Sequence, residues 1–389
     1  MLNAATNLPH EYEVKILSGD RGVVSQIADE WRALCEEGVS NQPFYRPEWF
    51  EAYLEAFEPQ AKLLLFTVRN CGRLRAVLPL IEERALFLGV PVRKLRSPTN
   101  VHSNRFDIAV GSDSSKELLQ RLWAALESYH WDVVELQDVP VQGMAREFLG
   151  CAQQAGSPVG LWESMRTPYI PLPQSAKDVE SALGKSDSNF FSNLKKKMKK
   201  LEKSGAVQLN ASRSADQTIL DRFYDMEMAT WKGREGTAIA CDAATRRFYD
   251  LLAQAAARYG YLDIQTLTCG EDAAAMNFSL TLGGKHFIPK TTYSEKFSQS
   301  SPGQLIMREA IRSCLTQGIR EMDFLGPWVS WKGHWTSETR EHSHCYIFRA
   351  GAKGTFLHFL KFTAAATARR LKREWQRRRG ARQAAKQAS

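Results

Sequence analysis

One order of predicted elements occurs twice in the chain, and this repeat constrains the fold more than any other feature. Apolar runs, turn signals and helical spacing in the first half predict two strands, a helix and a strand at 63–68, 74–81, 116–129 and 132–137. The second half repeats the order with one further strand, at 262–268, 273–282, 286–292, 303–316 (helix) and 319–325. The two helices begin 187 residues apart, and so do the two final strands. The sequence therefore predicts an α+β fold of two related modules in tandem, each a mixed sheet flanked by helices.

The composition is that of an ordinary globular protein, with 43% hydrophobic and 24% charged residues in a chain of 389. No apolar run reaches the roughly 18 residues of a membrane-spanning helix. The N-terminus lacks a basic segment followed by an apolar core, so we expect no signal peptide. The seven cysteines are odd in number and none has Cys-x-x-Cys spacing. We therefore expect reduced thiols in a cytoplasmic protein.

The net charge of +9 resides in the C-terminal tail. Residues 353–389 carry 11 basic residues and one acidic residue, whereas 1–352 carry 41 basic and 42 acidic residues. One helical stripe of the tail is apolar and comprises Leu357, Leu360, Ala364, Ala368, Leu371 and Trp375. We expect a basic amphipathic helix that binds an anionic membrane surface peripherally, at the inner face. Binding of RNA, including tRNA, is the alternative.

The chain divides into three predicted parts: an N-terminal module at 1–165, a C-terminal module at 166–350 and the tail at 351–389. The second module begins with an amphipathic helix at 190–203 that carries six lysines on one face. This helix is either a solvated surface helix or a binding surface.

A turn in the second module has the pattern of an anion site. Ser301 is a natural N-cap and Pro302 fits the first position of the helix that follows. Gly303 lets another group approach the backbone, where free N–H groups and the positive end of the helix dipole attract phosphate. An ordinary helix start remains the alternative.

Tryptophan and lysine gather in two further segments. Asp323-Phe324-Leu325-Gly326 ends a predicted strand, and Trp328, Trp331 and Lys332 follow. A lysine between indoles can stabilise a developing oxyanion, or it can be an exposed residue beside an apolar plug. Trp231-Lys232-Gly233-Arg234 ends a helix and is either an anion clamp or a basic helix C-terminus.

Several enzyme classes lack support. The histidines at 342 and 344 lie near no carboxylate at ligand spacing, so we expect no metal site. The chain has no Gly-x-Ser-x-Gly elbow, no Walker loop and no complete dinucleotide fingerprint.

Together, these pieces resemble a known family. The basic helix ending at Gly205, the 231–234 segment, the small residue Ala275, the 301–305 turn and the 323–326 strand end resemble the GNAT acetyltransferase domain of CelD-type and BioF2-like proteins. This domain is related to the Fem aminoacyltransferases, which have two GNAT-like modules. The resemblance covers roughly 40–350 and is strongest over 190–335. It implies N-acyl transfer from a thioester or ester donor to an amine, in polysaccharide or cell-envelope biosynthesis.

The resemblance also implies roles for residues. The donor, acetyl-CoA or another acyl-CoA, would bind at Gln299, Ser300, Ser301, Gly303, Gln304 and Leu305. Because the turn departs from the usual glycine-rich loop, acyl carrier protein and aminoacyl-tRNA stay open as donors. We expect Asp323 as general base with Glu295 in reserve, and Lys332 as oxyanion stabiliser. Candidate substrate contacts are Arg46, Trp231, Lys232, Lys290, Tyr293, Trp328 and Trp331. The alternatives are a Fem-type tRNA-dependent aminoacyltransferase and a non-catalytic scaffold of an envelope assembly.

Overall fold

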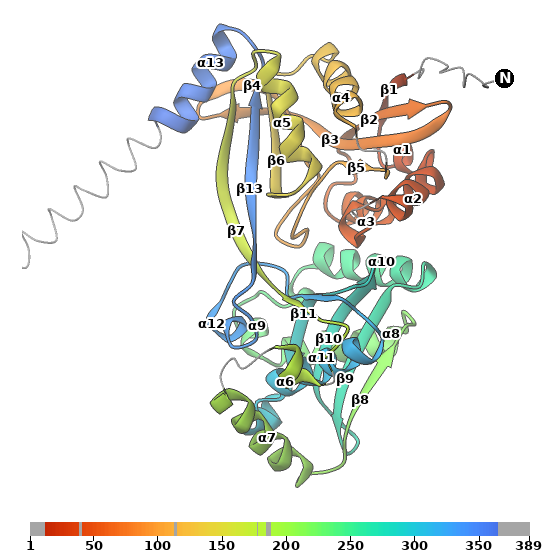
Figure 1. The fold of residues 1–389 in the computed structure, drawn as a ribbon, viewed down its shortest axis with the longest axis vertical. Coiled ribbons are helices and arrows are strands. Elements are labelled where there is room, and N and C mark those ends of the chain that lie inside the picture. Colours follow the sequence, from red (N-terminus) through yellow and green to blue (C-terminus); the bar gives the residue numbers. More distant parts are fainter. Residues whose placement is uncertain (1–11, 39–40, 113–114, 177, 184–187, 365–389) are drawn as a thin grey trace, which may run out of the picture.

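A single mixed sheet runs through both halves of the molecule. The computed structural model describes residues 12–38, 41–112, 115–176, 178–183 and 188–364 (Figure 1). The sheet has thirteen strands in the order β1-β2-β3-β4-β6-β13-β7-β12-β11-β10-β9-β8, with β5 paired to β3. The predicted α+β class with two modules in tandem is confirmed.

The first module contains the predicted hairpin, helix and strand. Its strands are β1 (Tyr12–Gly19), β2 (Lys62–Asn70), β3 (Arg73–Phe87), β4 (Val90–Arg96), β5 (Ala109–Val110) and β6 (Val133–Pro140). Its helices are α1 (Gly22–Ser25), α2 (Ala28–Glu37), η1 (Pro43–Tyr45), α3 (Pro47–Phe57), α4 (Lys116–Ser128) and α5 (Met144–Gln154). Helix α4 buries Leu118, Leu122 and Trp123 on one face, as its apolar spacing predicts.

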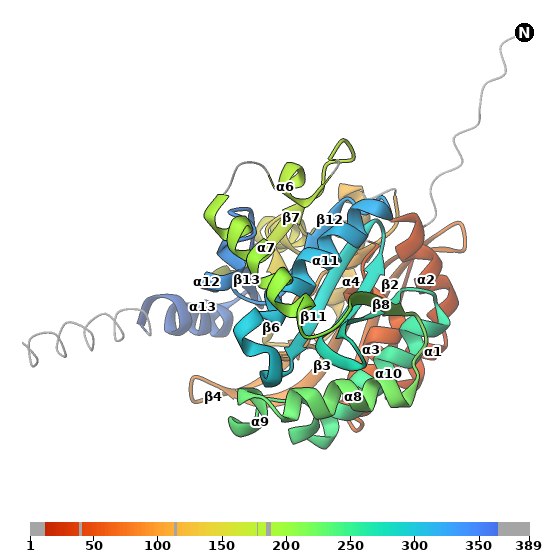
Figure 2. The same cartoon turned by 90° about the horizontal axis from the view of Figure 1, so that it is seen from below.

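The second module repeats this order. Its strands are β8 (Val207–Ser212), β9 (Leu262–Cys269), β10 (Asp272–Leu282), β11 (Lys285–Tyr293) and β12 (Glu321–Asp323). Its helices are α6 (Val179–Ala182), α7 (Ser188–Glu202), α8 (Gln217–Met228), α9 (Trp231–Arg234), η2 (Ile239–Cys241), α10 (Ala243–Arg258), η3 (Glu295–Ser300), α11 (Pro302–Thr316) and α12 (Ser330–Gly333). Helices α7 and α11 lie on one side of its strands, and α8 and α10 lie on the other (Figure 2).

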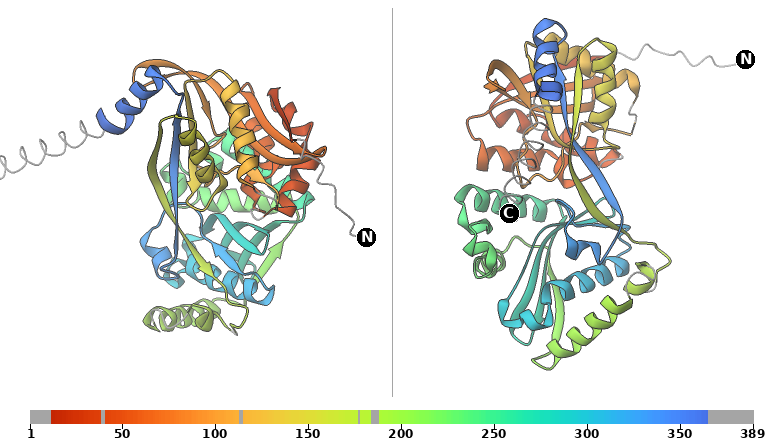
Figure 3. Two further views of the ribbon diagram at one scale, coloured as in Figure 1. Left: turned by 45° about the horizontal axis from the view of Figure 1, so that its top comes forward. Right: turned by 90° about the vertical axis from the view of Figure 1, so that its left-hand side faces the viewer.

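Two long strands join the modules. Strand β7 (Val159–Pro171) pairs with β13 along most of its length and with β12 at its end. Strand β13 (Thr339–Phe348) follows the second module in sequence but lies between β6 and β7 (Figure 3). The last strand thus completes the sheet of the first module, and the boundary that we placed after residue 165 falls inside β7.

Aromatic side chains also connect the modules. The ring centroids of Trp49 on α3 and Phe248 on α10 are 5.2 Å apart, and those of Phe44 and Phe287 are 5.3 Å apart. These residues belong to one apolar cluster that spans both modules. Because such contacts bury apolar area without a water layer, the modules pack as one unit.

The described part of the tail packs on the first module. Helix α13 (Ala352–Phe359) is followed by a π-helical turn, η4 (Leu360–Ala364). Leu357 is buried with Phe87, Tyr346 and Phe348. The first residue of the apolar stripe predicted for the tail therefore packs against protein. The rest of that stripe, from Ala368 onward, lies outside the described residues. In the described ranges, no helix combines the length and apolarity needed to cross a bilayer.

Candidate active site

The strands β11 and β12 pair only briefly, and a cavity begins where they part. Their parallel pairing covers Lys285–Phe287 and Glu321–Asp323. Strand β12 then ends, because Leu325 and Gly326 both take positive φ angles, 52° and 60°. Strand β11 continues to Tyr293, with a register shift against β10. A cavity of about 670 Å³ lies between the two segments and is lined by both.

This cavity brings together nine of the residues that the sequence singled out. They are Trp231, Lys232, Lys290, Tyr293, Ser301, Gly303, Gln304, Trp331 and Lys332. The others do not line it, namely Arg46, Glu295, Gln299, Ser300, Leu305, Asp323 and Trp328. The candidate site therefore spans three segments, the start of α11, the open part of β11 and the loop after β12.

The N-terminus of α11 opens into the cavity. Gly303 lines it, and the ring of Tyr293 lies 3.4 Å from the place where a Cβ on Gly303 would be. The N–H groups of Gln304 and Leu305 both donate to the carbonyl of Ser301, whereas the N–H of Gly303 donates to no group in the described ranges. That N–H, together with the helix dipole, is available to an anion.

Ser301 differs from the prediction. It occupies the N-cap position, but its φ is 52° and its side chain makes no capping hydrogen bond. A capping side chain acts from an extended backbone, and the left-handed conformation of Ser301 does not provide this. Its hydroxyl therefore does not occupy the helix N-terminus as a cap would.

Three residues predicted to bind the donor do not line the cavity. Leu305 is fully buried in the apolar cluster of the second module, and Ser300 is 5% exposed. Gln299 is exposed and held by the basic helix α7. Lys197 donates to its backbone carbonyl and Lys200 to its side-chain oxygen, each over 2.6 Å. Two lysines of that helix thus fix the turn that precedes α11.

Lys332 lies in the loop after β12 and is nearly buried, with 8% exposure. Its ammonium donates to the carbonyls of Leu325, over 2.6 Å, and Pro327, over 3.0 Å. An ammonium has three N–H donors, so one remains for the cavity that Lys332 lines. Burial lowers the pKa of Lys332 to about 8, against the opposing effect of Asp323.

Asp323 is fully buried at the end of β12 and does not fit the predicted general base. Its Oδ2 accepts hydrogen bonds from Arg105, over 2.6 Å, and from Arg340, over 2.9 Å. The N–H of Leu325 donates to its Oδ1. Burial raises its pKa, but the two guanidinium groups outweigh burial and hold the pKa below its usual range. A carboxylate stabilised in this way is a poor proton acceptor.

The reserve base, Glu295, and two predicted contacts are also outside the cavity. Glu295 is exposed and accepts a hydrogen bond from Arg234, which lowers its pKa. Arg46 is buried near the module interface, where it donates to Asn41 and Glu36. Trp328 is 51% exposed and packs on Gly333.

Lys232 lines the cavity, but its charge is already neutralised. It donates to the buried carboxylate of Glu227 over 2.8 Å and to the carbonyl of Thr291 over 2.7 Å. The second oxygen of Glu227 accepts the N–H of Ile239. The pair therefore fixes α9 against β11, and Trp231, 45% exposed, stands at the cavity edge.

Comparisons with known proteins find a family match in the second module. Residues 188–333 match the family model of the acetyltransferase (GNAT) domain. These residues are similar to GNAT domains. The resemblance that the sequence motifs indicated is thus confirmed for the module that contains the cavity.

One solved structure shares the fold at low identity, and two others show a weaker similarity. FemX is similar with a TM-score of 0.59 and 12% identity, over 86% of this chain and 98% of FemX. The C-terminal domain of a putative lysylphosphatidylglycerol synthetase from Agrobacterium fabrum has a TM-score of 0.49 and 9% identity, over 83% and 92%. A tandem GNAT protein from the clavulanic acid biosynthesis pathway has a TM-score of 0.44 and 10% identity, over 87% and 99%. No curated protein sequence matches significantly.

The first module contributes residues to the GNAT cavity that the sequence analysis missed. Asn104 lines the cavity from the loop between β4 and β5, and Arg105 beside it binds Asp323. Arg340 reaches the same carboxylate from β13. Nothing in the local sequence links these residues to the GNAT domain, since 218 positions separate Arg105 from Asp323.

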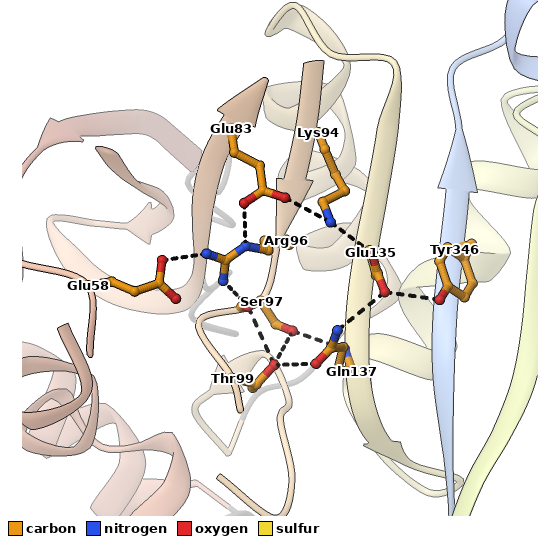
Figure 4. A network of polar contacts seen from close by, with 9 residues as sticks. All are labelled: Glu58, Glu83, Lys94, Arg96, Ser97, Thr99, Glu135, Gln137 and Tyr346. Carbon is orange, nitrogen blue, oxygen red and sulfur yellow. Dashed lines mark hydrogen bonds and ion pairs between the residues drawn. The ribbon is translucent and has the colours of Figure 1, made fainter. Parts of the chain in front are cut away.

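A polar network fixes the start of this loop. Gln137 on β6 donates its N–H to the hydroxyl of Ser97, and Thr99 donates to the side chain of Gln137 (Figure 4). The same network continues through charged and polar side chains of β3, β4, β6 and β13, including Glu83, Lys94, Arg96, Glu135 and Tyr346. The loop that reaches the GNAT cavity is therefore anchored at its base.

The described residues of this domain contain no cluster of metal-binding side chains. Within the described residues, no group of three or more His, Cys, Asp or Glu side chains is placed to hold an ion. His342 and His344 both belong to β13, where His342 is buried.

Proposed function

We propose that the protein is an N-acyltransferase that moves an acyl group, such as acetyl, from a CoA-type thioester to an amine. The observation that carries the proposal is the N–H of Gly303, which has no partner in the described ranges and lies in the cavity that Lys332 also lines. An anion-binding helix start next to a buried ammonium suits a donor with a phosphate end and a reactive carbonyl.

The open edge of β11 supports donor binding. Because Ser294 donates its N–H to Ala274 of β10, strand alternation turns the N–H groups of Thr291 and Tyr293 away from β10, toward the cavity. The carbonyl of Thr291 on that edge accepts from Lys232. An extended amide-bearing arm, such as that of an acyl thioester, can pair with such an edge.

Acyl transfer to an amine requires an activated carbonyl and a neutral amine. It also requires stabilisation of the carbonyl oxygen as negative charge develops on it. The acyl donor supplies the carbonyl. Lys332 supplies an ammonium N–H at the cavity wall, held in place by the carbonyls of Leu325 and Pro327. Among the described residues that line the cavity there is no Asp or Glu. We infer that the neutral amine attacks the thioester carbonyl and that the C–S bond breaks as the amide forms. The CoA thiolate leaves and takes up the proton that the amine loses, by way of solvent or another cavity group.

Calorimetric titration of the purified protein with CoA and acetyl-CoA tests the proposal, with charged tRNA and acyl carrier protein as alternative donors. We expect CoA and acetyl-CoA to bind and to raise Tm, by mass action on the folded state. Binding of charged tRNA alone would replace the proposal with a tRNA-dependent aminoacyltransferase. Binding of none of these donors would favour a non-catalytic scaffold.

A further inference from the structure

The cavity has two sides, separated by β11. Ile288 and Tyr293 pack with the apolar cluster that contains α11, on the side of the expected donor site. Lys290, also on β11, faces the other side, where its Nζ lies 5.7 Å from the ring centroid of Tyr249 on α10. Figure 2 shows these two helices on opposite sides of the strands. A donor on the α11 side therefore leaves the α10 side for the acceptor.

The charges along the cavity are unbalanced. Its described lining includes three lysines and no carboxylate. Lys232 is paired with Glu227, and Lys332 donates to two carbonyls. The ammonium of Lys290 makes no hydrogen bond and no ion pair with any described residue, and it lies near the ring of Tyr249.

A half-buried ammonium without a counter-charge is costly to the folded state. Burial lowers the pKa of Lys290, and the charge of Lys232 lowers it further, whereas Glu227 opposes both. Glu227 makes no ion pair with Lys290 in the described structure, and its two oxygens already bind Lys232 and the N–H of Ile239. An oxyanion of a ligand would supply the missing partner.

We propose that the acceptor is an amine that also carries an oxyanion, a phosphate or a carboxylate, and that Lys290 binds this group on the α10 side of β11. The inference rests on the proposed function, because it names the class of its acceptor. Trp231 and Asn104 line the same cavity and can contact the neutral part of such a molecule.

Three small amines test the proposal on protein saturated with CoA, so that the donor site is filled. Phosphoethanolamine and β-alanine each carry an amine and an oxyanion. Ethanolamine carries the amine without an anionic group and is the control. We expect at least one anionic amine to bind at least tenfold more tightly than ethanolamine in calorimetric titration. Which of the two binds more tightly distinguishes phosphate from carboxylate.

Variants assign the effect to Lys290. Lys290→Met should remove the preference, Lys290→Arg should retain it, and Tm of Lys290→Met should not fall, since an unpaired charge is removed. The matched control is Lys296→Met, an exposed lysine paired with Asp272 outside the cavity, which should behave as the parent. Three results would overturn the inference. Ethanolamine could bind as tightly as the anionic amines, neither anionic amine could bind, or Lys290→Met could keep the preference of the parent.

The two proposals fail separately. Protein that binds CoA without preferring anionic amines contradicts only the acceptor assignment. Protein that binds anionic amines through Lys290 but does not bind CoA contradicts the donor and leaves Lys290 as an anion site.

Discussion

Arg105 of the first module donates a hydrogen bond to Asp323 of the second over 2.6 Å, and both side chains are almost fully buried. Arg340 on β13 binds the same oxygen. The end of β12, from which the loop to Lys332 departs, is thus held by residues on both sides of the module boundary. Asp323 holds the end of β12 and does not line the cavity.

Replacement of Asp323 tests this role. In Asp323→Asn, the buried guanidinium of Arg105 loses its counter-charge, and Arg340 keeps only its pair with Glu321. We therefore expect a loss of about 3–5 kcal/mol in the free energy of unfolding. Chemical denaturation measures it, with Glu295→Gln as a control that keeps the midpoint of the parent, because Glu295 is exposed. A general base would instead give a stable variant with lost turnover.

Low pH should weaken the same contact. Because the folded pKa of Asp323 is lowered, the unfolded carboxyl binds a proton first as pH falls. Its contribution is fully present above about pH 4, the unfolded pKa, and disappears as pH falls through the folded pKa. The free energy of unfolding, measured by denaturation at several pH values, should therefore decrease less toward acidic pH in Asp323→Asn than in the parent. Equal declines would contradict the lowered pKa.

Removal of the Lys332 ammonium should reduce turnover. With an amine acceptor in hand, we expect Lys332→Met to lose about 10²–10³-fold in kcat, the typical cost of one oxyanion donor. The Kd of CoA should stay within a few-fold, which separates this effect from donor binding. Turnover within a few-fold of the parent would remove Lys332 from the mechanism.

The rate should also depend on the protonation of Lys332. Its pKa is about 8, so the ammonium, and with it the rate, should decline as pH rises above that value. Lys332→Arg keeps its charge at all accessible pH values, so any activity that it retains should lack this alkaline limb. A limb at the same pH in both proteins would point to another group.

The tail offers a separate prediction. We propose that the basic residues after 364 bind anionic membranes, at about 1 kcal/mol for each Lys or Arg near the surface. Truncation after residue 364 keeps Leu357 in its apolar cluster, so Tm should not change. Co-sedimentation with vesicles containing phosphatidylglycerol should be lost on truncation, and unchanged pelleting would contradict the proposal.

The sequence predicted what depends on local pattern. Helix α4, the β2–β3 hairpin and the Pro302-Gly303 helix start follow from apolar spacing and turn residues, and Lys332 follows from its place after a strand end. The pairing of Asp323 with Arg105 and Arg340 was not predictable, because it depends on a loop and a strand from the other module. The order of the sequence likewise assigns strand β13 to the second module. Only its pairing in the sheet places it between β6 and β7.

The same limit explains the misplaced base. From sequence, a carboxylate at a strand end, followed by a loop with tryptophans and a lysine, is typical of an active site. Its burial and its two arginine partners become evident only in three dimensions. Conversely, Lys290 carried no signal beyond its charge, and its isolation from carboxylates is a property of the packed cavity.

We propose that the free N–H at the start of α11 binds the phosphate end of the donor. Gly303→Pro deletes this N–H at a first-turn position that tolerates proline, and Gly303→Ala keeps it at a site where a Cβ meets only ordinary contact with Tyr293. Calorimetric titration with CoA, on variants whose Tm matches the parent, measures the difference. We predict at least tenfold weaker binding for Gly303→Pro and parent-like binding for Gly303→Ala, and equal CoA affinity in all three proteins would contradict the claim.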